Sequence, residues 1–272
     1  MLSESQLAQY RRDGFLFPLP TMAPGEAGRY RQAMEVFEAE RGKKAQQVLR
    51  QKCHLALRWA YELVSHPKLL DAAESLIGPD ILCWSTSFFI KEANDPRYVS
   101  WHQDPTYWHL DNDDLVSAWI ALSPSTVENG CLRVLPGTHR GRMAHFETDD
   151  PKNYLTRGQT LADAVDESKA VPVELQPGEA ALFHALTVHG SPPNPSDQRR
   201  IGFAIRYIPT SVAPEQGVWD SAMLVRGEDR YGHFELEPPP AGDGDPASMA
   251  YLEYILSKKQ DGIYRQGKML VA

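Results

Sequence analysis

The feature that most constrains the fold of this chain is a series of short segments rich in β-branched and aromatic residues between Pro79 and Pro209. Residues typical of turns separate these segments, and no long helical pattern intervenes. The segments are residues 81–91, 98–104, 116–123, 131–135, 171–175, 180–188 and 201–208. This density of strands favours a sandwich, a jelly roll or a barrel over a parallel α/β sheet, which requires helices between its strands.

Helical periodicity occurs mainly on either side of the strand-rich region. Ser3 and Gln6 form a capping-box pattern, so we expect a short helix that ends before Gly14. Further helices are predicted at residues 24–41, 57–64, 66–77 and 247–259. The polar segment 138–170 is too long for a tight hairpin, which predicts either a lid or an insertion with small helices.

Composition narrows the class of partner. The chain has 28 Lys and Arg against 36 Asp and Glu, a net charge of −8, and no basic run, so we expect a small-molecule substrate and no nucleic acid. No apolar segment is long enough for a membrane span, and the first residues lack the layout of a secretory signal. Cys53, Cys83 and Cys131 form no CxxC pair and are predicted to be buried thiols. We therefore predict a cytoplasmic protein without membrane attachment.

Two histidines and one aspartate have a spacing that suits a metal site. His102 and Asp104 are two residues apart in a strand-like segment, which places both side chains on the same face. His189 follows another strand-like run. Two imidazoles and one carboxylate can bind ferrous iron on one face and leave adjacent positions open. A hydrogen-bonded His–Asp pair without a metal is the alternative for the HxD triplet alone.

A basic residue on the next predicted strand adds to this pattern. Arg200 lies eleven residues after His189, and a guanidinium there can hold a carboxylate by two parallel hydrogen bonds. Alternation places Arg200, Arg206 and the small residues between them on one face, which leaves room for a long side chain or a ligand, while Arg199 points the other way. The alternative is that Arg199 and Arg200 are surface charges at the start of a strand.

Three runs of sequence together resemble the phytanoyl-CoA dioxygenase family of iron(II)- and 2-oxoglutarate-dependent oxygenases. They are WHQDPTYW, SAWIALSPSTVENGCLRVLPGTHRG and VHGSPPNPSDQRRIGFAIRY, with a weaker match in SESQLAQYRRDGFLF. The resemblance implies a mainly β fold with flanking helices, a cupin-like double-stranded β-helix (jelly roll). It also implies a set of site residues: His102, Asp104 and His189 as catalytic iron ligands, Arg200 as the partner of the distal 2-oxoglutarate carboxylate, and Ser191 and Trp119 as walls of the co-substrate pocket.

The same resemblance implies a reaction. With Fe(II) as cofactor and 2-oxoglutarate and O2 as co-substrates, such an enzyme hydroxylates an unactivated C–H bond of a small metabolite and releases succinate and CO2. Halogenating relatives carry Gly or Ala in place of Asp104, so its carboxylate favours hydroxylation. An oxidative halogenase or desaturase on the same scaffold, and a non-catalytic metal-binding jelly roll, remain alternatives.

Three residues are candidates for contact with the substrate. Tyr107 and Trp108 follow the HxD segment, where their rings either form a cation–π wall for an amine or pack at the mouth of the barrel. Arg206 is a candidate for an anionic group of the substrate. Lys91 is interpreted as a solvated lysine at a strand end, with a second positive charge near the co-substrate as the alternative.

We expect a single domain of residues 1–272. Its parts are a helical N-terminal part at about 1–78, a jelly-roll core at about 80–210 and a C-terminal extension at 211–272. No oligomeric state is predicted.

Overall fold

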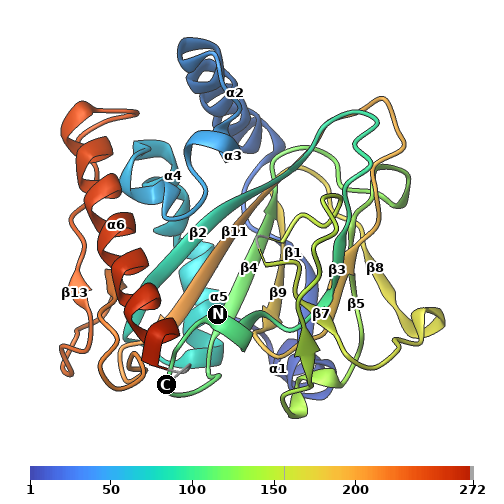
Figure 1. Ribbon diagram of the computed structural model, residues 1–272. Coiled ribbons are helices and arrows are strands. Elements are labelled where there is room, and N and C mark those ends of the chain that lie inside the picture. The colour runs from blue at the N-terminus through green and yellow to red at the C-terminus, as the bar shows by residue number, and fades with distance from the viewer. Residues whose placement is uncertain (156, 270–272) are drawn as a thin grey trace.

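Two β-sheets face each other in the computed structural model, which describes residues 1–155 and 157–269 (Figure 1). The side chains of Tyr107 and of residues 260–269 lie outside this description. The larger sheet has the order β1 (Phe15–Pro20), β9 (Glu179–His184), β4 (Val116–Ala121), β11 (Arg200–Pro209), β2 (Ile81–Lys91), β12 (Ser221–Arg226) and β13 (Glu235–Leu236). The smaller sheet has the order β3 (Val99–His102), β10 (His189–Ser191), β5 (Leu132–Val134) and β8 (Val171–Val173).

All these pairs are antiparallel except β12 with β13. A separate antiparallel pair, β6 (His145–Phe146) and β7 (Thr160–Leu161), lies in the predicted insertion. Two antiparallel sheets packed face to face confirm the predicted jelly-roll class.

Helices cover the outer face of the larger sheet. In Figure 1, α4, α5 and α6 lie on one side of this sheet and the smaller sheet lies on the other. The helices are α1 (Glu4–Asp13), α2 (Pro24–Arg41), α3 (Ala45–Val48), α4 (Arg58–Val64), α5 (Pro67–Ile77) and α6 (Pro246–Met269). Short 3₁₀ turns are η1 (Cys53–Leu55), η2 (Asp104–Tyr107), η3 (Val127–Asn129), η4 (Thr138–Arg140) and η5 (Glu167–Lys169). No helix in the described part of the chain is long and apolar enough to cross a membrane.

The predicted capping box at the start of α1 is present. The Ser3 hydroxyl accepts a hydrogen bond from the Gln6 amide, and the Gln6 side chain accepts one from the Ser3 amide. Gly14 ends the helix at φ 85°, a left-handed conformation that glycine adopts without steric cost. The helix therefore begins and ends where the sequence predicts.

The side chains of strand β11 point alternately to the two faces of the larger sheet, one covered by the helices and one facing the smaller sheet. Ile201, Phe203 and Ile205 are completely buried in the cluster formed with the helices. The residues that alternate with them, among them Arg200, Ala204 and Arg206, face the space between the sheets. Because neighbouring side chains of a strand point to opposite faces, one strand both anchors the helices and lines the interior.

Two predicted strands differ from the observed ones. The strand at 98–104 ends at His102, and Asp104 begins η2. The strand predicted at 180–188 ends early, at His184, the last residue of β9 in the larger sheet; residues 185–188 form a turn, and β10 begins in the smaller sheet with His189. A continuous apolar run does not reveal where a chain crosses from one sheet to the other, since residues on both sides of the crossing are buried.

The structure also contains strands that were not predicted, namely β1, β6, β7, β12 and β13. Strand β1 has the sequence FLFPLP, and its two prolines argue against a strand. They are tolerated because β1 is an edge strand that pairs only with β9.

Candidate metal and co-substrate site

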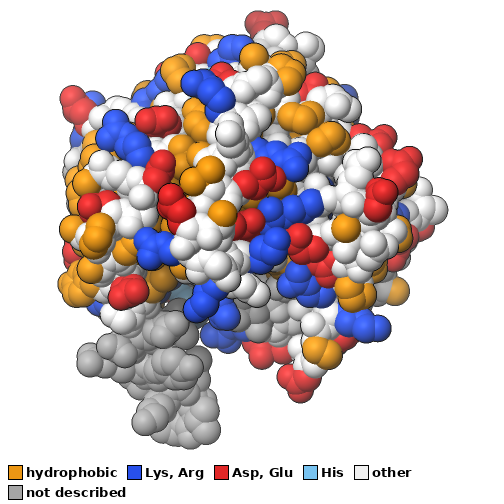
Figure 2. Space-filling view, turned by 90° about the horizontal axis from the view of Figure 1, so that it is seen from above, with side chains coloured by type: hydrophobic (Ala, Val, Ile, Leu, Met, Phe, Trp, Pro, Cys, Tyr) orange, Lys and Arg blue, Asp and Glu red, His pale blue; other side chains and the backbone are white. Residues whose placement is uncertain are grey.

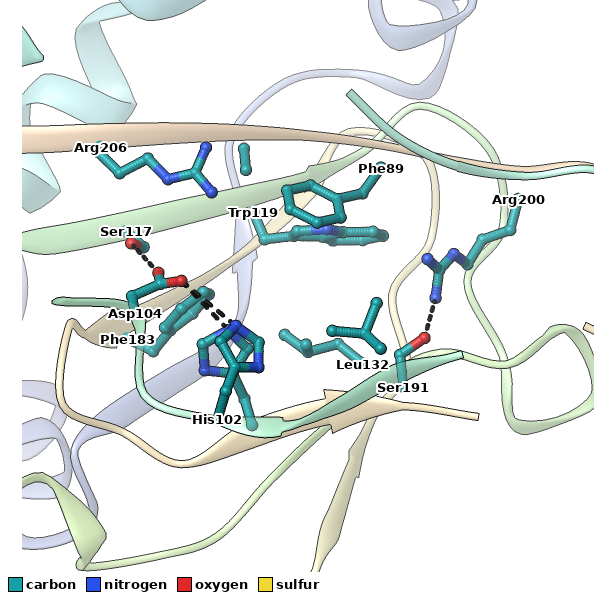
Figure 3. Close-up of a pocket in the computed structure, with 13 residues that line it drawn as sticks. Phe89, His102, Asp104, Ser117, Trp119, Leu132, Phe183, Ser191, Arg200 and Arg206 are labelled. Atoms are coloured by element: carbon teal, nitrogen blue, oxygen red, sulfur yellow. Dashed lines mark hydrogen bonds and ion pairs between the residues drawn. The ribbon is translucent and has the colours of Figure 1, made fainter. Parts of the chain in front are cut away.

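The structure brings His102, Asp104 and His189 together between the sheets (Figure 3). His102 and His189 are paired across β3 and β10, and their ring centroids are 4.1 Å apart. The Asp104 Oδ1 atom lies 3.5 Å from His102 Nε2 and 3.8 Å from His189 Nε2. One donor atom from each residue therefore faces a common point, as three ligands of a metal ion do.

Backbone contacts fix the tautomer of both histidines. His102 Nδ1 donates a hydrogen bond to the carbonyl oxygen of Ser100, and His189 Nδ1 donates one to that of Thr187, each at 2.8 Å. A carbonyl oxygen only accepts, so each Nδ1 carries the proton and each Nε2 offers a lone pair. Ser117 donates a 3.4 Å hydrogen bond to Asp104 Oδ2, the oxygen away from the histidines. The donor set and its orientation fit a divalent metal.

The protonation states also suit metal binding. Burial raises the pKa of Asp104, but the nearby His189 and His102 outweigh this effect and hold the pKa well below its usual range. Burial and the neighbouring His102 lower the pKa of His189 to about 4. At neutral pH the site thus contains a carboxylate and a neutral His189 imidazole, the forms in which these side chains bind metals.

Arg200 lies at one end of the same cavity with unused hydrogen-bonding capacity. It is 2% exposed, and its Nη1 donates to the carbonyl oxygen of Gly130 and, at 3.3 Å, to Ser191 Oγ. Its Nε has no partner, and Arg200 forms no ion pair with the described residues. Its guanidinium lies 5.5 Å from the centre of the Trp119 ring. A buried guanidinium with an unsatisfied donor fits a carboxylate ligand.

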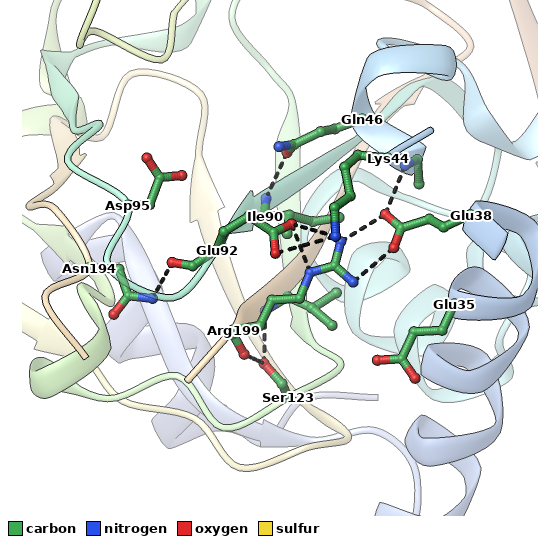
Figure 4. A network of polar contacts seen from close by, with 12 residues as sticks. Glu35, Glu38, Lys44, Gln46, Ile90, Glu92, Asp95, Ser123, Asn194 and Arg199 are labelled. Atoms are coloured by element: carbon green, nitrogen blue, oxygen red, sulfur yellow. Dashed lines mark hydrogen bonds and ion pairs between the residues drawn. The ribbon is translucent and has the colours of Figure 1, made fainter. Parts of the chain in front are cut away.

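Arg199 points away from the cavity, as predicted. Its guanidinium forms hydrogen bonds of 2.9 and 2.7 Å with the two carboxylate oxygens of Glu38 in α2, and one of 3.0 Å with Glu92 (Figure 4). The two adjacent arginines therefore have different surroundings, one in the interior and one in an ion-pair network that joins α2 to the sheet.

The interpretation of Lys91 as a solvated lysine is wrong. Lys91 is 0% exposed and pairs directly with Arg200 in the register of β2 and β11. Its Nζ donates hydrogen bonds to Ser191 O, at 3.2 Å, and to Ser191 Oγ and Pro192 O. Burial and the neighbouring Arg200 lower its pKa. The lysine appears at the end of β2 in the sequence, but the loop after β10 covers it.

Some of the other residues predicted to bind the co-substrate or the substrate line the cavity. Ser191, Trp119 and Arg206 line it with the triad and Arg200. Trp108 lies beside it, 5.9 Å from the Arg206 guanidinium. The side chain of Tyr107 lies outside the described part of the structure.

Sequence reasoning missed several lining residues. The cavity is also lined by Phe89, Val99, Ser117, Leu132 and Phe183, and by Ala204, which the alternation along the strand of Arg200 places on this face. Ser117 was detectable, since it is two residues before Trp119 on the same strand and therefore on the same face. Leu132 and Phe183 carry no such signal, because an apolar strand residue does not indicate which core it faces.

The comparison with known proteins begins with a family model. The model described as phytanoyl-CoA dioxygenase (PhyH) matches residues 10–202. An L-proline trans-4-hydroxylase of Streptomyces griseoviridis is 28% identical over 246 residues, which cover 80% of this chain and 91% of the relative. A probable phytanoyl-CoA dioxygenase of Caenorhabditis elegans is 27% identical over 155 residues, which cover 54% of this chain and only 50% of the relative.

Solved structures agree with this comparison. The non-heme monooxygenase ThoJ, in its apo form, has a TM-score of 0.84 at 34% identity and covers 96% of this chain and 98% of its own. CytC3 with Fe(II) and alpha-ketoglutarate has a TM-score of 0.65 at 26% identity, covering 86% of this chain and 92% of its own. The predicted fold and family are thereby confirmed. The chain belongs to the phytanoyl-CoA dioxygenase family.

Proposed function

We propose that this protein hydroxylates a small-molecule metabolite at an unactivated C–H bond, consuming 2-oxoglutarate and O2 and releasing succinate and CO2. The observation that carries the proposal is the joint presence, in one cavity, of the His102–Asp104–His189 triad and an unpaired Arg200 guanidinium. A metal with open coordination positions on one side can bind a co-substrate there, and a buried guanidinium beside it can hold the carboxylate of that co-substrate.

Each residue has a distinct role in this proposal. His102, Asp104 and His189 hold iron(II), which, when bound, supplies the activation of O2 and the removal of hydrogen from the substrate. Arg200 holds the distal carboxylate of 2-oxoglutarate, and Ser191 shares this contact from the end of β10. Trp119 lies against the Arg200 guanidinium and fixes its direction. Phe183 and Leu132 exclude water from the interior.

The alternatives are weaker on this geometry. Asp104 places a carboxylate oxygen beside His102 and His189, as a third ligand for the metal. A halogenase of this family has no carboxylate at this position and leaves that coordination site free. A non-catalytic module has no need of the buried, unpaired Arg200 beside its metal site.

A small substrate and a cytoplasmic location are parts of the same proposal. One relative is named for hydroxylation of L-proline, a small molecule. On the face shown in Figure 2, Lys and Arg side chains are interspersed with Asp and Glu and form no continuous basic surface. Three free, buried cysteines support a reducing compartment.

Replacing Asp104 by Ala tests the site. We expect at least a 100-fold loss of iron(II) affinity and no detectable succinate release, because changes outside the ligand set already cost about 10–100-fold. Metal binding is measured by calorimetry under anaerobic conditions, and turnover by succinate and by product mass in the presence of chloride. The control is His109→Ala, which removes a surface histidine paired with Glu215.

The outcomes separate the alternatives. A product heavier by one oxygen supports hydroxylation, whereas chlorine incorporation or loss of two hydrogens supports halogenation or desaturation. The proposal fails if the wild-type protein binds neither iron nor 2-oxoglutarate and releases no succinate with any substrate of a broad panel.

A further inference from the structure

A second arginine lies at the end of the cavity opposite Arg200. Arg206 is six residues further along β11, so the two Cα atoms are about 20 Å apart at a rise of about 3.3 Å per residue. In Figure 3 the two guanidinium groups lie at opposite ends of the lining residues, and Asp104 is near the Arg206 end. An anion held at Arg200 therefore leaves Arg206 free.

The contacts of Arg206 orient its guanidinium without neutralising it. Nη1 donates a 3.0 Å hydrogen bond to Ser87 Oγ, and the guanidinium lies 5.7 Å from the ring centre of Phe89 and 5.9 Å from that of Trp108. Arg206 forms no ion pair with any described residue within 4.0 Å. A guanidinium has five N–H donors in a planar fork, so most of them are available to a ligand in the cavity.

The surroundings of Arg206 are those of a cavity wall and not of the surface. Burial lowers the pKa of Arg206, although the nearby Asp104 acts in the opposite direction, and the guanidinium stays charged. The side chain nevertheless keeps intermediate exposure, because it lines the cavity. An enclosed charge without a counter-ion is costly, and a bound anion removes that cost.

The charges in the cavity indicate what kind of anion completes it. Among the described residues that line it, Asp104 is the only acid, whereas Arg200 and Arg206 are both cationic. Iron(II) and the 2-oxoglutarate dianion cancel each other in charge. The two arginines and Asp104 then leave a net charge of +1 in the cavity. One substrate carboxylate balances this charge, whereas a phosphonate dianion would leave the cavity with a net charge of −1.

We propose that Arg206, which lies near the rings of Phe89 and Trp108, binds the carboxylate of the substrate, and hence that the substrate is a small organic acid. This inference rests on the proposed function and adds the chemical class of its substrate. The Arg206 guanidinium donates two parallel hydrogen bonds to the carboxylate, and the rings of Phe89 and Trp108 lie 5.7 and 5.9 Å from the guanidinium.

The first test measures binding without turnover. Protein loaded with nickel(II) and 2-oxoglutarate is titrated by calorimetry with matched pairs: L-proline and L-prolinamide, benzoate and benzamide, and cyclohexanecarboxylate and its carboxamide. We expect the acids that bind to do so at least 10-fold more tightly than their amides. Arg206→Gln is expected to abolish this difference, and Arg206→Lys to keep part of it. Arg29→Gln, on the exposed side of α2, is the control.

A second measurement covers the case in which no acid of the panel fits. A metabolite extract that stimulates succinate release is treated with acidic methanol, which converts carboxylic acids to methyl esters. We expect the stimulation to disappear and to return after alkaline hydrolysis. Stimulation that survives esterification, amides that bind as tightly as acids, or an Arg206→Gln variant that still discriminates between them each overturns the proposal.

These outcomes are distinguishable from a failure of the proposed function. If Arg206 only supports Asp104, Arg206→Gln weakens nickel binding and leaves the preference for acids intact. If the protein is not an oxygenase, no extract stimulates succinate release from 2-oxoglutarate. Unchanged nickel and 2-oxoglutarate affinity in Arg206→Gln, with loss of acid binding, supports the assignment to the substrate.

Discussion

The small residue at position 202 determines where the largest ring of the co-substrate pocket lies. A Cβ atom at Gly202 would overlap the indole of Trp119, which lies across this part of β11. The room that small residues on this face were expected to provide is therefore filled by Trp119 itself. The ring in turn lies against Arg200. A glycine is required here because of close approach and not because of its backbone conformation.

Gly202→Ala is expected to move Trp119 toward Arg200 and to raise the KM for 2-oxoglutarate by about 10-fold, with a loss of stability of about 1–3 kcal/mol from overpacking. The KM is measured from succinate release, and stability from chemical unfolding. Gly28→Ala in α2 is the matched control, since a Cβ there meets no atom within 4 Å. An unchanged KM for 2-oxoglutarate in Gly202→Ala contradicts the role given to Trp119.

At the scale of elements, the residue between His102 and Asp104 connects the metal site to the insertion. The Gln103 side chain is buried and donates hydrogen bonds to Gly141 O at 2.9 Å and Leu186 O at 2.8 Å. Its Oε1 accepts a 2.7 Å hydrogen bond from the Met143 amide. The loop after η4 is thus held to the end of β3 by one amide group.

Gln103→Met keeps the length of the side chain and removes these hydrogen bonds. Two of these hydrogen bonds, those with Gly141 and Met143, hold the loop, and at about 1 kcal/mol each their loss is expected to destabilise it by about 2 kcal/mol. Hydrogen exchange followed by mass spectrometry should show faster exchange in residues 138–145. Gln176→Met, at an exposed turn position, should leave exchange there unchanged. Equal protection in wild type and Gln103→Met would show that other contacts hold the loop.

At the scale of the whole molecule, the C-terminal extension is joined to the N-terminal helical part by a buried ion pair. Glu237 follows β13, and its Oε1 lies 2.6 Å from Lys52 Nζ, with both side chains 0% exposed. Its Oε2 lies 3.2 Å from His54 Nε2. Lys52 Nζ also donates to the carbonyl oxygens of Trp84 and Ser221. Residues 185 positions apart therefore share one closed network.

This network predicts a pH dependence of stability. Burial raises the pKa of Glu237, but the charge of Lys52 and the hydrogen bond of His54 outweigh it and lower the pKa to about 2, from an ordinary value of 4.5. Because the folded-state pKa is the lower one, the stabilisation is complete above pH 4.5 and is lost as the pH falls toward 2. Its size is about 3 kcal/mol.

Chemical unfolding at pH 5 and pH 3 measures this effect. Glu237→Gln should unfold more easily at neutral pH, by about 3–5 kcal/mol, since Lys52 stays buried without its partner. It should also lose less stability than the wild type between pH 5 and pH 3. Glu253→Gln, at an exposed position of α6, should keep the wild-type pH dependence. A wild-type pH dependence in Glu237→Gln would rule out this carboxylate as its source.

Much of the candidate site could be predicted from the sequence alone. The HxD spacing, His189 and Arg200 are recognisable because their chemistry and order are local properties, and the alternation along β11 predicts which arginine faces inward. Helix ends at Ser3 and Gly14 follow from capping preferences, which act within a single turn.

Other properties arise only when distant segments meet. The burial of Lys91 results from the end of β10 and the loop after it, about one hundred residues away, and the early end of β9 at His184 results from a change of sheet. The ion pair of Lys52 with Glu237, and the lack of an ion pair between Arg206 and any described residue, likewise depend on what the fold places nearby. Strand periodicity and ligand chemistry act over a few residues and are readable from sequence, whereas burial and charge balance are set by contacts between remote parts of the chain.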